Sequence, residues 1–255
     1  MARLPNIIRP LQLIWLSVKF HYAAFKADFS KNGLSSIAHP QRIRDAAVAN
    51  LLTTIAPGFI AYEDTTIVPS LARTCHGKIL ELGPGPGNNI HRYDASLVDF
   101  IYAIDPNDNY GAAIAATAKR FDLQDKYKFI ACGVEDSDVL RKEGVEERSM
   151  DTVLSLQVLC AVRDVKSVMR EVYKLLKPGG SFVFWEHEKS RDTLTAVTQS
   201  CLNPAWSGFV GCNMNRNIMA DILAAGEWQN PGEIEVGDDP HSVLPRIWGV
   251  LKKKA

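Results

Sequence analysis

The stretch "KILELGPGPGNNIHRY", residues 78–93, decides the fold, because it joins a short apolar run to a turn with three glycines. Residues 78–82 have the length and the apolar character of a buried strand. In open α/β sheets, ligands bind at the carboxyl ends of the strands, where a strand-to-helix turn of this kind lies. The bare backbone therefore predicts a ligand-binding turn, which Pro84 and Pro86 stiffen before a ligand arrives.

Strand-like runs alternate with helical patterns after this turn, in the order that builds a parallel sheet with helices on both faces. The clearest helices span 110–121 and 165–176, and the second ends at "KPGG", where proline and glycine open a turn. We predict an α/β fold over 76–255, with a Rossmann-like, seven-stranded, mostly parallel sheet. The expected strands are 78–82, 100–104, 127–131, 151–156, 181–185, 233–236 and 246–251.

Residues 1–75 precede this alternating core and are predicted to form an N-terminal helical extension. Their apolar residues recur at helical spacing, but "LQLIWLSV" between Arg9 and Lys19 is much shorter than the roughly 20 apolar residues that a membrane span needs. Two interpretations stay open. The helix either covers the domain or its pocket, or lies in a membrane interface with Trp15 at the level of the lipid headgroups.

The composition limits the classes of function. The chain has 29 basic and 29 acidic residues and no basic cluster beyond residues 252–254, which argues against nucleic acid as a partner. The cysteines form no C-x-x-C pair, so we expect free thiols, a cytoplasmic location and no metal site. They are Cys75, Cys132, Cys160, Cys201 and Cys212.

The glycine turn does not match the dinucleotide fingerprint G-x-G-x-x-G. Counting from Gly83 or from Gly85 requires a glycine where the chain has Asn88 or Ile90. A P-loop is also absent, because no Gly-Lys-Ser/Thr follows. What remains is E/D-x-G-x-G-x-G, which resembles motif I of class I S-adenosylmethionine-dependent methyltransferases. Its residues here are Glu81, Gly83, Gly85 and Gly87.

Further landmarks agree with that resemblance. Asp105 directly follows the second predicted strand, where a carboxylate can accept hydrogen bonds from ribose hydroxyls. The resemblance implies S-adenosylmethionine as cofactor and S-adenosylhomocysteine as product. The alternative is a plain tight turn followed by a solvated acid. By the same resemblance, the cofactor would also contact Pro106, Val134, Glu135 and Leu156.

The second half of the chain resembles the methyltransferase-like protein 7 group and its fungal relatives over roughly residues 75–251. The matching motifs are "LQVLCAV", "FWEHE", "NPAW", "GCNMNR" and "PRIWGVL". This resemblance implies methylation of a small molecule, at a thiol in the animal members, and an N-terminal segment that associates with the endoplasmic reticulum or lipid droplets. The chain departs from the group in its shorter apolar segment and in Gln157, where an apolar residue is common.

Methyl transfer from a sulfonium depends largely on holding the acceptor in line with the methyl group. His187, shortly after the fifth predicted strand, is the candidate base for a thiol acceptor, and Glu186 would orient a partner or accept from the substrate. Anchoring the loop after the strand explains both residues equally well. An H-E-x-x-H zinc site is excluded, because no second histidine follows Glu188 at that spacing.

The acceptor pocket is predicted at the end of the fourth strand and in the C-terminal motifs. Core packing also explains its apolar members, and a surface salt bridge explains Arg216. An apolar wall predicts a small lipophilic acceptor. The family resemblance implies that this acceptor, such as a secondary metabolite, is methylated at a thiol or hydroxyl. A cyclisation or rearrangement on the same fold and a non-catalytic, membrane-attached binding protein are the alternatives. The predicted acceptor-binding residues are Gln157, Leu159, Trp206 and Arg216.

Overall fold

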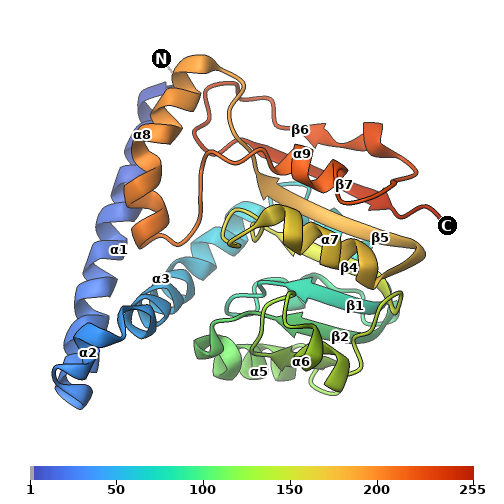
Figure 1. Ribbon diagram of the computed structural model, residues 1–255, viewed down its shortest axis with the longest axis horizontal. Coiled ribbons are helices and arrows are strands. Elements are labelled where there is room, and N and C mark those ends of the chain that lie inside the picture. Colours follow the sequence, from blue (N-terminus) through green and yellow to red (C-terminus); the bar gives the residue numbers. More distant parts are fainter. Residues whose placement is uncertain (1–2) are drawn as a thin grey trace.

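The computed structural model describes residues 3–255, and its centre is a seven-stranded sheet in the order β3-β2-β1-β4-β5-β7-β6 (Figure 1). The strands from β3 to β5 are parallel, and β7 runs antiparallel to both β5 and β6. This confirms the predicted Rossmann-like, mostly parallel sheet. The strands are β1 Gly77–Leu82, β2 Val98–Ile104, β3 Tyr127–Ile130, β4 Met150–Leu156, β5 Leu176–His187, β6 Glu235–Val236 and β7 Arg246–Lys252.

Every strand differs from its predicted bounds by at least one residue, and for β5 and β6 the structure shows the cause. The predicted turn at "KPGG" lies inside β5. Leu176 pairs with Met150 and Ser181 pairs with Thr152, so residues 177–180 form a bulge between these two pairs. β6 is shorter than predicted, because Pro231–Glu233 forms a 3-10 turn in front of it.

Helices cover both faces of the sheet, and the alternation of side chains along each strand supplies both cores. α6 (Ser137–Lys142), α7 (Val165–Leu175) and α9 (Ile218–Leu223) pack on the face that carries Leu80 and Phe182. α4 (Val68–Arg73) and α5 (Gly111–Arg120) pack on the face that carries Ile79 and Val183.

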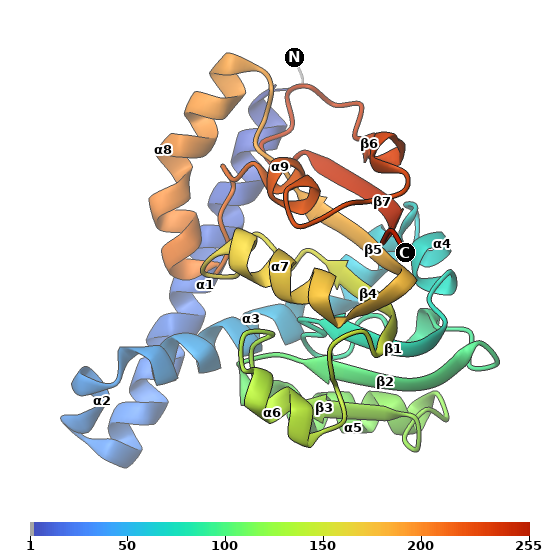
Figure 2. The same cartoon turned by 45° about the vertical axis from the view of Figure 1, so that its right-hand side comes forward.

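A separate helical layer lies beside the sheet rather than on it (Figures 1 and 2). α1 (Arg3–Asn32) packs against both α8 (Thr193–Phe209) and α3 (Pro40–Glu63), and the short α2 (Ser35–Ala38) connects α1 to α3. The Ser17 hydroxyl donates to the Phe209 carbonyl at 2.5 Å, which joins the first helix to the last long one. Among residues 3–255, no helix is both long enough and apolar enough to span a bilayer.

Candidate active site

A cavity of about 670 Å³ opens at the carboxyl ends of the parallel strands, between the sheet and the layer formed by α1, α3 and α8. α1 contributes Leu13 to its wall, so the N-terminal helix covers part of the cavity. The predicted site residues that line it are Gly83, Gly85, Asp105, Pro106, Leu156, Gln157, His187 and Trp206. The predicted site residues outside its lining are Glu81, Gly87, Val134, Glu135, Leu159, Glu186 and Arg216.

The glycine turn presents bare backbone to this cavity. Gly83 and Gly85 have φ of +54° and +52°, which side chains other than glycine rarely adopt. A Cβ on Gly83 would lie 2.7 Å from Val158 Cγ2, whereas a Cβ on Gly85 would meet nothing within 4 Å. The space at Gly85 is therefore open to a bound molecule, and the close approach at Gly83 fixes the turn against the loop after β4.

Asp105 stands at the end of β2, in the next turn along the cavity wall. The Asn107 backbone amide donates to Asp105 Oδ1 at 2.8 Å, and Asn107 Nδ2 donates to the Asp45 carbonyl of α3 at 2.9 Å. Burial raises the pKa of Asp105 to about 6, and the neighbouring Asp45 carboxylate acts in the same direction. Among the described residues, the backbone amide of Asn107 is the donor to this carboxylate, which leaves its Oδ2 for a ligand hydroxyl.

Glu81, the acid of the glycine motif, supports the turn from beneath. Its side chain is buried, with Oε1 accepting from Asn89 Nδ2 at 2.9 Å and Oε2 from the Tyr127 hydroxyl at 2.6 Å. Its role in the structure is to hold the turn and β3 together. Val134, also predicted to contact the cofactor, is buried in the core under α6 and α7.

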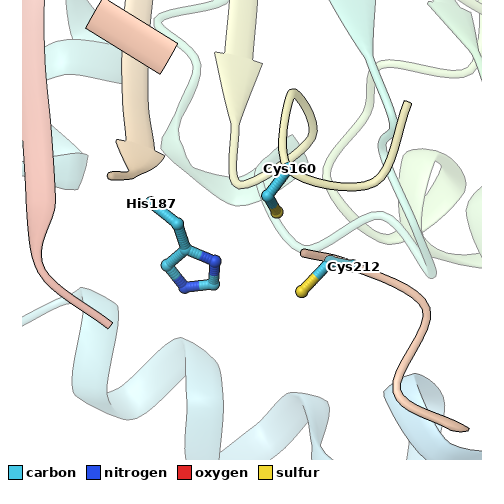
Figure 3. A group of neighbouring side chains, drawn as sticks. All are labelled: Cys160, His187 and Cys212. Carbon is cyan, nitrogen blue, oxygen red and sulfur yellow. The ribbon is translucent and has the colours of Figure 1, made fainter. Parts of the chain in front are cut away.

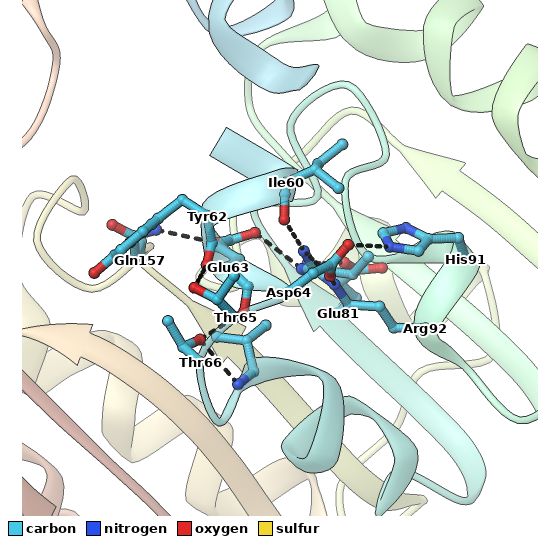
Figure 4. A network of polar contacts seen from close by, with 12 residues as sticks. Ile60, Tyr62, Glu63, Asp64, Thr65, Thr66, Glu81, His91, Arg92 and Gln157 are labelled. Atoms are coloured by element: carbon cyan, nitrogen blue, oxygen red, sulfur yellow. Dashed lines mark hydrogen bonds and ion pairs between the residues drawn. The ribbon is translucent and has the colours of Figure 1, made fainter. Parts of the chain in front are cut away.

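A polar network crosses one wall of the cavity (Figure 4). Gln157 has a φ of +61°, a strained value for a residue other than glycine. Its Nε2 donates to Glu63 Oε1 at 3.1 Å, and its Oε1 accepts from Arg246 Nη2 at 2.7 Å. Glu63 Oε2 also accepts from Arg92 Nη1 at 2.9 Å. The network therefore ties the loop after β4 to the end of α3 and to the start of β7.

The sequence predicts Gln157 as a site residue but predicts neither of its two partners, Arg246 and Glu63. Arg246 lay within the quoted motif "PRIWGVL", opposite His187 in the β5–β7 ladder. No feature of the sequence marks Glu63 as a site residue, because a lone glutamate near the end of a helix is usually solvated.

His187 lies at the carboxyl end of β5 and is only 6% exposed, yet neither ring nitrogen has a hydrogen-bond partner among the described residues. Two cysteine side chains approach it, Cys160 from the loop after β4 and Cys212 from the loop after α8 (Figure 3). The two sulfur atoms and an imidazole nitrogen lie within 4.8 Å of one another. Trp206 Nε1 donates to Cys212 Sγ at 2.9 Å.

Glu186 points away from the cavity. It is fully buried, with Oε1 accepting from the Ser155 hydroxyl at 2.7 Å and from the Val158 amide at 2.9 Å, and Oε2 from the Leu159 amide at 3.1 Å. Burial raises its pKa to about 7 against the effect of these donors. The carboxyl group therefore anchors the loop after β4.

Arg216 is likewise an anchor of that loop. Its guanidinium donates to the carbonyl of Leu159 at 3.2 Å and to that of Val162. Leu159 itself is buried in the core. Of the four predicted acceptor-binding residues, Gln157 and Trp206 line the cavity.

The family described as methyltransferase domain matches residues 80–184. The chain is 32% identical over 162 residues to the thiol S-methyltransferase TMT1B of Rattus norvegicus, an alignment that covers 60% of this chain. It spans 63% of the length of that relative.

Solved structures share the fold at low sequence identity. An O-methyltransferase family protein from Burkholderia thailandensis superposes with a TM-score of 0.58 at 15% identity and covers 98% of this chain and 72% of its own. The [4+2]-cyclase SpnF superposes with a TM-score of 0.56 at 14% identity and covers 77% of this chain and 81% of its own. Because proteins with different reactions share this architecture, these likenesses establish the fold and leave the reaction to the site.

Proposed function

We propose that this protein transfers the methyl group of S-adenosylmethionine to a thiol or hydroxyl of a small lipophilic molecule. The match of residues 80–184 to the methyltransferase-domain family and the fold shared with solved methyltransferases support the proposal. The observation that carries the proposal is a single cavity shared by the glycine turn, Asp105 and His187. The likeness to a thiol S-methyltransferase favours sulfur over oxygen as the acceptor atom.

The residues at one end of the cavity fit the cofactor that the methyltransferase domain implies. The turn is open at Gly85, and Asp105 keeps a carboxylate oxygen for ribose hydroxyls. Gly83, Gly85, Asp105, Pro106 and Leu156 would hold S-adenosylmethionine, whose sulfonium supplies an already activated methyl group. The main contribution of the protein to catalysis is therefore to bind the cofactor and the acceptor in the reactive orientation.

The other end of the cavity supports a lipophilic acceptor. Its wall is largely aliphatic and aromatic, so an apolar molecule gains free energy when it leaves water for this site. The apolar side chains come from four separate elements or loops. They are Leu13, Val48, Leu52, Ile55, Phe59, Val210 and Leu244.

His187 is the titratable side chain at which a thiol proton can be accepted. The thiolate is the nucleophilic form of a thiol, and imidazole is the side chain best suited to proton transfer near neutral pH. The ring is buried at the cavity wall and makes no hydrogen bond to the described residues, so both nitrogens are available.

The exposed face of α1 also supports the proposal that the protein makes a peripheral membrane contact. Its exposed apolar residues recur every three or four positions and so form one stripe, with Trp15 and Tyr22 62% and 65% exposed. The opposite side of the helix carries buried Ser17 and Ala24. We place the protein in the cytoplasm with this stripe in a membrane interface, where a lipophilic acceptor would be concentrated. The stripe consists of Ile8, Leu11, Trp15, Val18, Tyr22, Phe25 and Phe29.

The decisive experiment supplies S-adenosylmethionine with an isotopically labelled methyl group and a small lipophilic thiol. We expect the labelled thioether and one equivalent of S-adenosylhomocysteine by mass spectrometry. A product that forms without the label would contradict methyl transfer and favour a rearrangement or cyclisation on the same fold.

A further inference from the structure

We propose that Cys160, His187 and Cys212 bind a zinc ion whose fourth coordination position faces the cavity and takes the sulfur of a thiol acceptor. The zinc site itself stands on the geometry of the three side chains. The role of the fourth position rests on the proposed methyl transfer to a thiol.

The three donors converge from parts of the chain that are distant in sequence. Their ligand atoms lie within 4.8 Å of one another (Figure 3). Zinc–sulfur and zinc–nitrogen bonds of about 2.3 and about 2.0 Å place tetrahedral ligands roughly 3.5 Å apart. Zinc binding would therefore draw these three ligand atoms closer together.

The donor set matches zinc in its chemistry. Two thiolates and one imidazole are soft to intermediate ligands that suit zinc better than magnesium or calcium. Three protein ligands with an open fourth position are typical of catalytic zinc, whereas structural zinc has four. His187 and Cys212 both line the cavity, so the open position is within reach of an acceptor.

His187 gives an independent sign of a missing ligand. A buried polar group without a hydrogen bond costs free energy, and both imidazole nitrogens of this 6% exposed residue are unpartnered among the described residues. A bound cation would satisfy one of these nitrogens directly.

Hydrogen bonds next to the cluster hold the two loops that carry Cys160 and Cys212 together. Asn213 donates from its backbone amide at 2.8 Å and from Nδ2 at 3.1 Å to the Cys160 carbonyl, so the residue after Cys212 is fixed to Cys160. Trp206 Nε1 donates to Cys212 Sγ at 2.9 Å, and such a donor stabilises a metal-bound thiolate.

The site explains how a thiol would become a nucleophile. The acceptor sulfur bonds to zinc as its proton leaves to water, and zinc keeps the thiolate form populated near neutral pH. The new S–CH3 bond then forms as the S–CH3 bond of the sulfonium breaks, which gives a thioether, S-adenosylhomocysteine and the proton already released. In the zinc-bound protein His187 is a ligand, so zinc replaces it as the group that favours the thiolate.

Metal analysis of the purified protein tests the site without any turnover. We expect about one zinc per chain, retained through gel filtration, and a loss of at least tenfold in zinc affinity in Cys160→Ser and Cys212→Ser. Cys201→Ser is the matched control, because Cys201 is exposed and lies outside the cluster. Circular dichroism must show that each variant is folded. Folded wild-type protein without zinc, or equal loss in Cys201→Ser, would overturn the proposal.

Cobalt substitution adds a spectroscopic reading. Co²⁺ in a site with two thiolates is expected to give intense visible bands of tetrahedral cobalt, and Trp206→Phe should weaken cobalt and zinc binding about tenfold. A Cys160–Cys212 disulfide that persists when the protein is incubated with zinc and a reductant would contradict the site. If one zinc binds and added lipophilic thiol leaves the cobalt spectrum unchanged, the acceptor role fails while methyl transfer by other means stays open. If labelled methyl transfer is absent and thiol still perturbs cobalt, the proposed function fails instead.

Discussion

Gln157 Nε2 donates a hydrogen bond to Glu63 Oε1 at 3.1 Å, which connects the end of the parallel sheet to the end of the N-terminal helical layer. The contact forms although Gln157 must adopt a φ of +61°. Because the layer supplies one wall of the cavity, this link helps to set the shape of the acceptor site.

Replacing Gln157 by leucine should destabilise the fold by about 1–3 kcal/mol, since it leaves Glu63 and Arg246 each without one buried partner. Urea unfolding measures the change. Gln157→Asn is the control for backbone strain, because asparagine tolerates positive φ but is too short for both contacts. Equal stability of wild type and Gln157→Leu would show that the network contributes nothing.

Asp105→Asn should weaken S-adenosylmethionine binding about tenfold to a hundredfold, because hydrogen bonds to a charged acceptor are worth roughly 1.5–3 kcal/mol. Titration calorimetry gives the affinity. Asp108→Asn, an exposed acid on the same turn, is the matched control and should bind like wild type. Unchanged affinity in Asp105→Asn would remove this residue from the cofactor site.

The affinity for S-adenosylmethionine should rise about tenfold between pH 5 and pH 7, because the Asp105 pKa of about 6 leaves mostly the neutral form at the lower pH. The sign for stability is opposite. The pKa in the folded protein lies above its ordinary value of 3.8, so Asp105 takes away stability as the pH rises from about 4 to about 6. In Asp105→Asn both the affinity and the stability should lose this dependence, and a persisting rise in affinity would assign it to another group.

His187→Ala should lower methyl transfer to a thiol by about a hundredfold while the affinity for S-adenosylmethionine stays within twofold. Single-turnover assays with labelled cofactor separate the two quantities. Equal losses in both would make His187 a structural residue.

Glu186→Gln, unlike His187→Ala, should lower the stability of the fold and leave methyl transfer nearly unchanged. Its carboxylate accepts from one hydroxyl and two backbone amides, so the amide variant loses stability, by about 1–3 kcal/mol. Thermal unfolding measures this loss, and the activity per folded molecule should remain close to wild type. A catalytic loss in a fully stable variant would return Glu186 to the chemistry.

The double variant Trp15→Glu with Tyr22→Glu should lower binding to phosphatidylcholine vesicles by more than tenfold, since each exposed ring contributes roughly 1–2 kcal/mol when it enters the interface. Co-sedimentation measures the bound fraction. Leu97→Glu removes an exposed apolar residue far from α1 in the sequence and should bind like wild type. Equal binding of all three proteins would contradict the membrane contact.

The sequence by itself determined the parallel sheet, the bare turn at Gly83 and Gly85, and the acid at Asp105. Each of these follows from local rules: strand periodicity, the φ that only glycine adopts easily, and the place of a residue directly after a strand.

Only the tertiary structure decided which polar side chains meet. Glu186 and His187 are neighbours in sequence, yet alternation along β5 turns the first onto the backbone amides of the next loop and the second into the cavity. Gln157 finds Glu63, and Cys160 approaches Cys212, because separate loops converge at one edge of the sheet. The spacing of residues along a chain does not encode such convergence. It arises when the apolar faces of distant elements are buried against each other, because this burial also brings the polar residues at the ends of those elements into contact.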